Sequence, residues 1–232
     1  MIRGRLSCAA NRVVAIGDTH GHAEALTGLL RLVDPCSTDT IVFLGDYVSR
    51  GPDSRGVLQA VMDLRRHCQV VALLGNHEEM LLDARRDPES LALYVAVGGD
   101  AGLVTPLAGQ VDRSLTREHW AFLEDLRLSH ETDTHFFVHA NYAPNRHLGD
   151  QDRQTALWLP LDPPPGPHFS GKTAVVGHTV QIEGTVLNLG HLVCIDTGCG
   201  FGGLLTAYDV ESGQVWQVQE DGSSSPARHP NG

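Results

Sequence analysis

Polar side chains follow five apolar, β-branched runs of the sequence, each at the point where the run stops. The runs are RVVAIGD (12–18), TIVFLGD (40–46), QVVALLGNH (69–77), THFFVHA (134–140) and TAVVGHT (173–179). The polar residues that close them are Asp18 with His20, Asp46, Asn76 with His77, His139 and His178. Because the carboxyl ends of strands in an open α/β sheet meet in one crevice, we expect these side chains to lie around one point.

These residue types suit two divalent cations. Imidazole and carboxylate favour manganese, iron, zinc or cobalt, whereas an all-oxygen set would indicate calcium or magnesium. Asp18 and His20 are two residues apart, so in an extended segment they face the same side and can bind one ion. Asp46 has two carboxylate oxygens, which can bridge two ions about 3.5 to 4 Å apart.

The second ion would take its remaining ligands from Asn76, His139 and His178. The two ions would draw a bridging water toward hydroxide at neutral pH, which provides a nucleophile for in-line attack on phosphorus. The sequence therefore predicts metal-dependent hydrolysis of a phosphoester, with manganese as our first choice of metal and iron, zinc or cobalt as alternatives.

Two neighbouring residues have predicted roles in catalysis. His77 follows Asn76, so in an extended segment its side chain points away from the metal direction and can protonate the leaving oxygen. Arg50 offers a planar donor fork that suits phosphate oxygens, and we expect Arg50 and Asn76 to contact the substrate. Standing alone, His77 would be interpreted as a core histidine and Arg50 as half of a surface ion pair.

The apolar runs are continuous rather than alternating, which is typical of strands buried on both faces, so helices should cover them. Residues 22–34 and 54–67 carry apolar stripes at helical spacing between the first three runs. This β-α-β-α-β order predicts a largely parallel sheet. Residues 78–128 are predicted to be helical, with a helix beginning at a Thr116 cap.

The last third of the chain has a different pattern. Short strands and glycine turns follow Thr173, including a predicted hairpin over 204–218 that turns at 211–213. Residues 162–167 (DPPPGP) indicate a stiff surface connection. We expect one catalytic domain over residues 1–220 and a flexible tail over 221–232.

Composition limits the classes of function. The 232 residues are 41% hydrophobic and 19% charged, and no apolar stretch approaches the length of a membrane-spanning helix. The net charge of −11 argues against a nucleic-acid partner, which needs a basic surface. The N-terminus lacks the pattern of a secretory signal, so we expect a cytoplasmic protein without a membrane partner. Five scattered cysteines without a C-x-x-C motif are expected to be reduced and mostly structural.

The motifs GDTHGH, GDYVSRGPDS, GNHEEM, VHA and GHT occur in this order and together resemble the calcineurin-like metallophosphoesterases. The chain is most similar to the small bacterial and phage branch of serine/threonine phosphatases, and ETDTHFFVHA, QDRQTALW and IDTGCGFGGLLTAYDVESGQ extend the resemblance over most of its length. The resemblance implies an α/β sandwich of two β-sheets flanked by helices, with a di-metal site at the carboxyl ends of the strands. It also implies phosphomonoester hydrolysis without a covalent phosphoenzyme.

Two departures from the family pattern bear on activity. The family's usual GDYVDRG motif has an aspartate where this chain has Ser49. A hydroxyl can accept a hydrogen bond from His77 but cannot stabilise imidazolium by charge, so we expect weaker or differently tuned general-acid catalysis. After Trp158, relatives often continue to an arginine near the phosphate, whereas this chain has Leu-Pro, which bears on how firmly substrate is held.

Two glycine-rich matches favour nucleotide binding only out of context. Residues 166–173 (GPHFSGKT) fit the P-loop pattern, but they precede a β-like run, so we interpret Gly171 and Lys172 as a turn before a strand. Residues 198–203 (GCGFGG) fit a dinucleotide-binding pattern, but another strand candidate follows them instead of a helix, so tight turns are the better interpretation.

Three functions are consistent with the sequence. The first is a metal-dependent phosphatase acting on phosphoserine or phosphothreonine in proteins. The second is a symmetrical diadenosine tetraphosphate hydrolase that uses the same centre on another phosphoester. The third is a non-catalytic metal-binding module of the same fold, against which the complete set of site residues argues.

Overall fold

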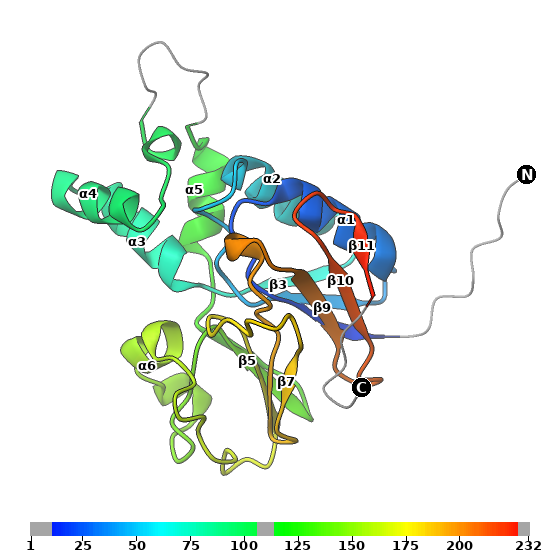
Figure 1. Ribbon diagram of the computed structural model, residues 1–232. Helices are drawn as coiled ribbons and strands as arrows, with labels where there is room; N and C mark the ends of the chain where they lie inside the picture. Colours follow the sequence, from blue (N-terminus) through cyan, green and yellow to red (C-terminus); the bar gives the residue numbers. More distant parts are fainter. Residues whose placement is uncertain (1–10, 106–113, 227–232) are drawn as a thin grey trace, which may run out of the picture.

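The strands of the computed structural model, which describes residues 11–105 and 114–226, form two sheets (Figure 1). The first sheet has six strands in the order β11-β10-β9-β1-β2-β3. Its strands are β1 (Val13–Ile16), β2 (Thr40–Phe43), β3 (Gln69–Ala72), β9 (Leu205–Asp209), β10 (Val215–Val218) and β11 (Ser224–Ser225). Strands β1, β2 and β3 are parallel, whereas β9 pairs antiparallel with β1 and begins an antiparallel half. The predicted parallel sheet is therefore only half of this one.

The second sheet has five strands in the order β4-β5-β6-β8-β7. Its strands are β4 (Ser129–Glu131), β5 (His135–Val138), β6 (Thr173–Val176), β7 (Leu187–Asn188) and β8 (Leu192–Cys194). The central strands β5, β6 and β8 are parallel, and β4 and β7 pair antiparallel at the two edges. Three parallel strands in each sheet therefore place their carboxyl ends at the middle of the molecule.

Alternating side chains of each sheet pack on two different layers. Val14, Ile16, Ile41 and Phe43 face the helices α1 (Ala23–Val33) and α2 (Ser54–Leu64), and form one core with them. Ala15, Val42 and Val71 face the other way and pack with Phe137, Val175 and Val193 between the two sheets. The outer face of the second sheet carries Phe136, Val138 and Ala174, which pack with Tyr142 and Ala156.

This arrangement confirms the predicted sandwich of two sheets flanked by helices and corrects one detail. Both faces of the central strands are buried, as their continuous apolar sequence indicates. Helices cover only the outer face of each sheet, however, because the inner face is covered by the other sheet.

The remaining helices lie mostly in the middle of the chain. They are α3 (Asn76–Ala84), α4 (Pro88–Ala96), α5 (Arg117–Glu124) and α6 (Arg153–Trp158), with the 3₁₀ turns η1 (Ala101–Leu103), η2 (Leu148–Asp150) and η3 (Cys199–Phe201). The helix α5 begins at Thr116, whose side chain caps it as predicted by accepting a hydrogen bond from the backbone of His119. Residues 106–113 of the expected helical region lie outside the described residues. No helix in the described parts of the chain is both long and apolar enough to cross a bilayer.

The C-terminal region agrees with the predicted hairpin and differs in the tail. Strands β9 and β10 pair antiparallel, and the backbone of Asp209 bonds to Gln214 across the turn. Ser224–Ser225 pairs with β10 as the edge strand β11, so the tail expected from residue 221 is part of the sheet at least to this point. Residues 227–232 lie outside the described residues.

Two further expectations concern single residues. Cys36 is disulfide-bonded, so the expectation that all five cysteines are reduced is wrong for this residue, whereas Cys68, Cys194 and Cys199 are free and buried. Lys172 follows a turn and precedes β6, and its Nζ lies 2.8 Å from Oε2 of Glu131, so the P-loop interpretation fails in its structural context.

Candidate metal centre

The polar residues that close the five strands come together between the two sheets. Asp18 and His20 follow β1, Asp46 follows β2, and Asn76 begins α3 after β3. His139 follows β5 directly, and His178 follows β6 by two residues. All six are buried except His178, which is half-buried. The structure therefore brings together every residue that the sequence predicts as a metal ligand.

Two overlapping groups of donor atoms share Asp46. One group contains His20, Asp46 and His77, and the other contains Asp46, His139 and His178; within each group the donor atoms lie within 4.8 Å of one another. The Nε2 atoms of His20 and His139 lie 3.5 and 3.6 Å from the two different carboxylate oxygens of Asp46. A carboxylate with one oxygen directed into each group has the geometry of a bridging ligand.

Hydrogen bonds to backbone carbonyls fix which imidazole nitrogen carries a proton in the second group. The Nδ1 of His139 lies 2.9 Å from the carbonyl of Leu44, and the Nε2 of His178 lies 3.2 Å from the carbonyl of Trp158, so these nitrogens must donate. The opposite nitrogens then carry lone pairs, and they lie 2.9 and 3.2 Å from Oδ1 of Asn76. An oxygen that faces two imidazole lone pairs is the donor set of a divalent cation.

His20 follows the same rule in the first group. Its Nδ1 lies 3.2 Å from the carbonyl of Val48 and donates to it, which leaves the Nε2 lone pair directed toward Asp46. Asp18 accepts a hydrogen bond from the backbone of His178 with Oδ2, while its buried Oδ1 has no partner among the described residues. An unpartnered buried carboxylate oxygen is costly unless a cation completes it, so Asp18 also fits the site.

Burial sets the ionisation of the whole cluster. It raises the pKa of Asp46 to about 7 and, together with the charge of Asp46, the pKa of Glu78 to about 8. Burial and the charge of Asp196 raise the pKa of Asp18 well above its usual range. Burial also lowers the pKa of His139 to about 4, so this imidazole is neutral and able to coordinate at pH 7. Without cations, the carboxylates oppose one another in a medium that solvates them poorly.

Several site residues have left-handed backbone conformations that favour glycine. The φ angles are 44° at His20, 52° at Asp46, 75° at Ser49, 69° at Arg50 and 61° at His178. Such conformations cost on the order of 1–3 kcal/mol each and persist only where surrounding contacts hold them. Their concentration at the strand ends shows that tertiary contacts, not local preference, shape these loops.

Glu78 supplies many of these contacts and was not singled out by the sequence. Its buried carboxylate accepts hydrogen bonds from the backbone N–H groups of Asp46, Tyr47, Val48 and Gly75, at 2.8 to 3.1 Å. This carboxylate therefore holds the loop that carries Asp46 and Arg50. Its position in the sequence could have revealed this role, because a glutamate three residues after the N-cap of a helix is typical of a capping box.

The direction of His77 differs from the prediction. The expectation that it points away from the metal direction assumed an extended chain, but α3 already begins at Asn76. The His77 ring lies edge-on to His20, with the ring centroids 4.9 Å apart, and its Nε2 lies 3.4 Å from Nη2 of Arg50. His77 therefore lies at the centre, beside both Arg50 and Asp46.

Ser49 and His77 do not hydrogen-bond to each other. The Nδ1 of His77 is buried without a hydrogen-bond partner among the described residues, and the buried hydroxyl of Ser49 interacts with the hydroxyl of Tyr94 instead. Burial and the charge of Arg50 lower the pKa of His77 to about 3. The side chain that replaces the family's aspartate thus leaves this imidazole without a polar partner at Nδ1.

Phe201 and Asp196 belong to the surroundings of the centre and were missed as site residues. The guanidinium of Arg50 lies over the ring of Phe201, with Cζ 4.0 Å from the ring centroid. Asp196 is buried two residues after β8, and burial raises the pKa of its carboxyl to about 6. Asp196 ends an apolar run in the same way as the five predicted stops, so that pattern could have found it.

The fold and the donor set are typical of a metal-dependent phosphoesterase. A family model described as calcineurin-like phosphoesterase matches residues 11–181, and the chain belongs to this family.

The chain is similar to proteins that are named for different substrates. The chain is 32% identical to serine/threonine-protein phosphatase 1 of Salmonella typhimurium, over 84% of this chain and 89% of that protein. It is 29% identical to the asymmetrical bis(5'-nucleosyl)-tetraphosphatase PrpE of Oceanobacillus iheyensis, over 85% of this chain and 88% of that protein. A crystal structure of a protein assigned as a diadenosine tetraphosphatase superposes with a TM-score of 0.68 and 23% identity, over 92% and 96% of the two chains. This last likeness supports the fold.

Proposed function

We propose that this protein is a metal-dependent phosphatase that removes phosphate from phosphoserine or phosphothreonine in proteins. The observation that carries the proposal is the pair of donor groups joined by Asp46, with Arg50 and His77 beside them. The similarity to a serine/threonine phosphatase over most of both chains supports this choice of substrate.

Six residues would hold two divalent cations. Asp18, His20 and Asp46 would hold one cation, and Asn76, His139 and His178 would hold the other together with Asp46. When bound, the cations would supply a more acidic water molecule as the nucleophile and would neutralise charge on the phosphate. Manganese is our first choice, because the donors are imidazole, carboxylate and carboxamide without a thiolate.

The side chains of this protein then have separate tasks. Arg50 would bind the phosphate oxygens with its donor fork, held in place by the ring of Phe201. The amide of Asn76 would also contact the phosphate. His77 lies beside Arg50 and would be the general acid for the leaving serine or threonine oxygen. Burial and the charge of Arg50 disfavour its protonated form, so a bound phosphate that offsets the charge of Arg50 would be needed to restore that form.

A second candidate is hydrolysis of a dinucleoside tetraphosphate, which the Oceanobacillus relative's name supports. The same centre can attack either phosphoester, because substrate choice in such folds depends on the surrounding loops. Hydrolysis of a phosphoprotein releases the serine or threonine hydroxyl as the leaving group, whereas hydrolysis of a dinucleoside tetraphosphate releases a nucleotide. Comparing the two substrates under one set of conditions therefore separates the candidates.

The test is the kcat/KM of the manganese-loaded protein on a phosphothreonine peptide and on diadenosine tetraphosphate. We expect a preference for the peptide, and a strong preference for the dinucleotide would overturn the proposal. Asp18→Asn should abolish turnover of both substrates, whereas the exposed Asp63, which pairs with Arg66 on the surface, serves as the matched control in Asp63→Asn. A protein that binds manganese and hydrolyses neither substrate would be a non-catalytic metal-binding module.

A further inference from the structure

Phe201 is a large exposed apolar side chain directly beside the centre. It lies on η3, between Gly198 and Gly202, both of which have left-handed backbone with φ near 80°. Its ring is 61% exposed, although one face contacts the guanidinium of Arg50 and the ring also lies edge-on to His20 at 6.4 Å. Phe201 therefore connects the phosphate-binding arginine to the surface outside the centre.

Phe201 forms part of the wall of an apolar groove. The groove has a volume of about 340 Å³, and its walls are formed by Val180, Ile182, Thr197, Gly198, Phe201 and Gly203. Ile182 is 94% exposed, which is costly for an isoleucine unless a partner covers it. The hydroxyl of Thr197 is already hydrogen-bonded to the carbonyl of Leu204 and to Thr206, so it does not offer a free polar group. The lining of this groove is therefore mainly apolar, as a site for an apolar side chain requires.

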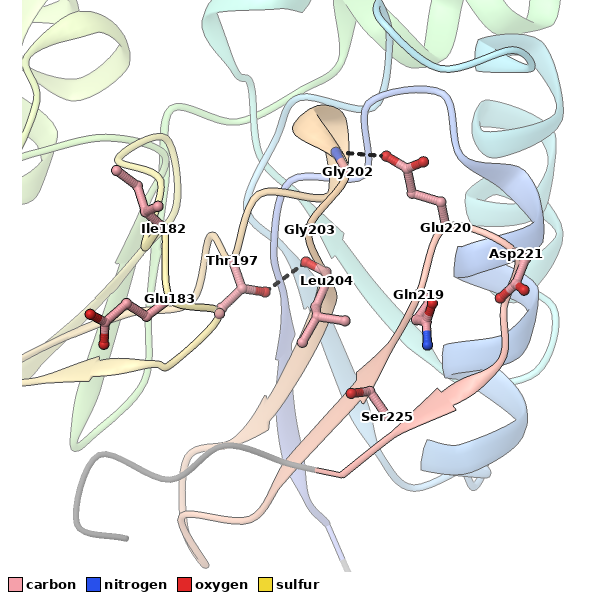
Figure 2. A pocket seen from close by; sticks show the side chains of 11 residues that line it. Ile182, Glu183, Thr197, Gly202, Gly203, Leu204, Gln219, Glu220, Asp221 and Ser225 are labelled. Carbon is pink, nitrogen blue, oxygen red and sulfur yellow. Dashed lines mark hydrogen bonds between the residues drawn. The ribbon is translucent and has the colours of Figure 1, made fainter.

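A larger hollow of about 520 Å³ adjoins the groove and shares Ile182, Thr197 and Gly203 with it (Figure 2). Its walls carry the carboxylates of Glu220 and Asp221, and no lysine or arginine is among the described residues that line it. The Oε1 of Glu220 also lies 3.5 Å from Nε2 of His22. The Oε1 of Glu220 accepts a hydrogen bond from the backbone of Gly202, which fixes one carboxylate at the end of the turn that bears Phe201 (Figure 2). Such a surface repels additional phosphates and favours a neutral or basic segment.

We propose that this groove, with Phe201, Val180 and Ile182, binds an apolar side chain of a phosphoprotein substrate, within two residues of the phosphorylated serine or threonine, in a segment that carries basic residues. The short distance follows from the contact between Phe201 and Arg50, because each residue of an extended peptide spans about 3.3–3.6 Å. The proposal rests on the proposed phosphatase function and adds a preference among its substrates. The repulsion of further phosphates by the acidic hollow is the reason for choosing a peptide over a dinucleotide as the occupant.

The test compares phosphothreonine peptides that differ at one flanking position. A lysine-containing peptide with leucine next to the phosphothreonine is compared with its alanine and aspartate versions, on the manganese-loaded protein. We expect the kcat/KM to be about tenfold higher for leucine than for alanine, which is the range of discrimination that a small apolar pocket supplies. We expect Ile182→Ser to reduce this leucine-to-alanine ratio to near one. The exposed Leu32, which lies on α1 outside the groove, provides the matched control Leu32→Ser, which should leave the ratio unchanged.

The outcomes separate the two proposals. Turnover of the peptides with a leucine-to-alanine ratio near one would overturn the groove assignment and leave the phosphatase function intact. A loss of diadenosine tetraphosphate turnover in Ile182→Ser, with the peptide ratio unaffected, would show that the groove binds a nucleobase and would also overturn it. Turnover of a simple aryl phosphate without turnover of any peptide would overturn the phosphoprotein function itself.

Discussion

Asp46 should make the metal-free protein less stable as the pH rises toward neutrality. Burial disfavours the ionised form of its carboxyl in the folded state, whereas the unfolded chain ionises freely. The pKa of Asp46 is raised from 3.8 to about 7 by burial, whereas in the unfolded chain it returns to its ordinary value. The folded protein therefore binds more protons than the unfolded chain between pH 4 and pH 8. The free energy of unfolding must fall as the pH rises through this window, and Asp46→Asn removes that dependence.

The magnitude follows from the two pKa values. As the pH rises from 5 to 8, the free energy of unfolding of a protein with this aspartate should fall by about 3 kcal/mol more than that of the asparagine variant. Asparagine suits the position, because its Oδ1 can accept the backbone N–H of His77 as Asp46 does and its amide can donate to Nε2 of His20. The charge of Asp46 also raises the pKa of Glu78 and of Asp18, so the difference between the two proteins reports the carboxyl of Asp46 together with its coupling to these neighbours.

The assay is urea denaturation of wild type and Asp46→Asn at pH 5, 6, 7 and 8 in the presence of a chelator. From pH 5 to pH 8, the free energy of unfolding of the variant should rise by about 3 kcal/mol relative to that of wild type. Manganese at pH 8 should make wild type the more stable of the two proteins, because it should stabilise wild type more. Asp39→Asn is the control, because the pKa of Asp39 is lowered: burial opposes the shift, but hydrogen bonds from Arg12 and Cys36 outweigh it. A stability difference between wild type and Asp46→Asn that stays constant from pH 5 to pH 8 would refute the reasoning.

Three further substitutions test the supports of the centre. The carboxylate of Glu78 accepts four backbone N–H groups, and Glu78→Gln leaves two of them without an acceptor. The free energy of unfolding in urea denaturation should therefore fall by about 2–5 kcal/mol. A loss below about 1 kcal/mol would contradict this role of Glu78. Ser49→Asp introduces a carboxylate that raises the pKa of His77, so the alkaline limb of the kcat profile should move to higher pH, and an unchanged profile would show that position 49 does not act on His77. Arg12→Met removes the guanidinium 2.6 Å from the fully buried Asp39 and should cost about 3 kcal/mol at pH 7. Because the folded pKa of Asp39 is lowered, this loss should shrink below pH 4, and a loss that is equal at pH 7 and pH 3 would contradict the assignment.

The strands and the meeting of their polar ends were predictable because each depends on local pattern. Continuous apolar runs such as 40–46 indicated strands buried on both faces, and the polar stop at Asp46 needed only the rule that parallel strand ends converge. The pattern left open what would cover the strands. A helix and a second sheet present the same apolar surface to a strand, and only the assembled chain distinguishes them.

The direction of His77 and the shape of its loop were not predictable in this way. The alternation rule failed at His77 because α3 begins one residue earlier, and such boundaries are the least certain part of a sequence prediction. Left-handed backbone at Asp46 and Arg50 contradicts local preference, so distant contacts must hold it: Glu78 accepts the N–H of Asp46, and the carbonyl of Gly98 accepts the N–H of Arg50. A contact between distant segments cannot be inferred from either segment alone.

The charge of the centre explains why an acidic protein can act on an acidic substrate. Asp18, Asp46, Glu78 and Asp196 are all buried around the place where a phosphate must bind, and Arg50 contributes one positive charge at its edge. A phosphate entering such a site without cations would meet net repulsion in a medium of low dielectric constant. Two divalent cations would supply four positive charges at the same point, so they would satisfy the carboxylates and attract the phosphate together. On this proposal, stability above neutral pH and affinity for the substrate depend on the same ions, and a change that weakens one should weaken the other.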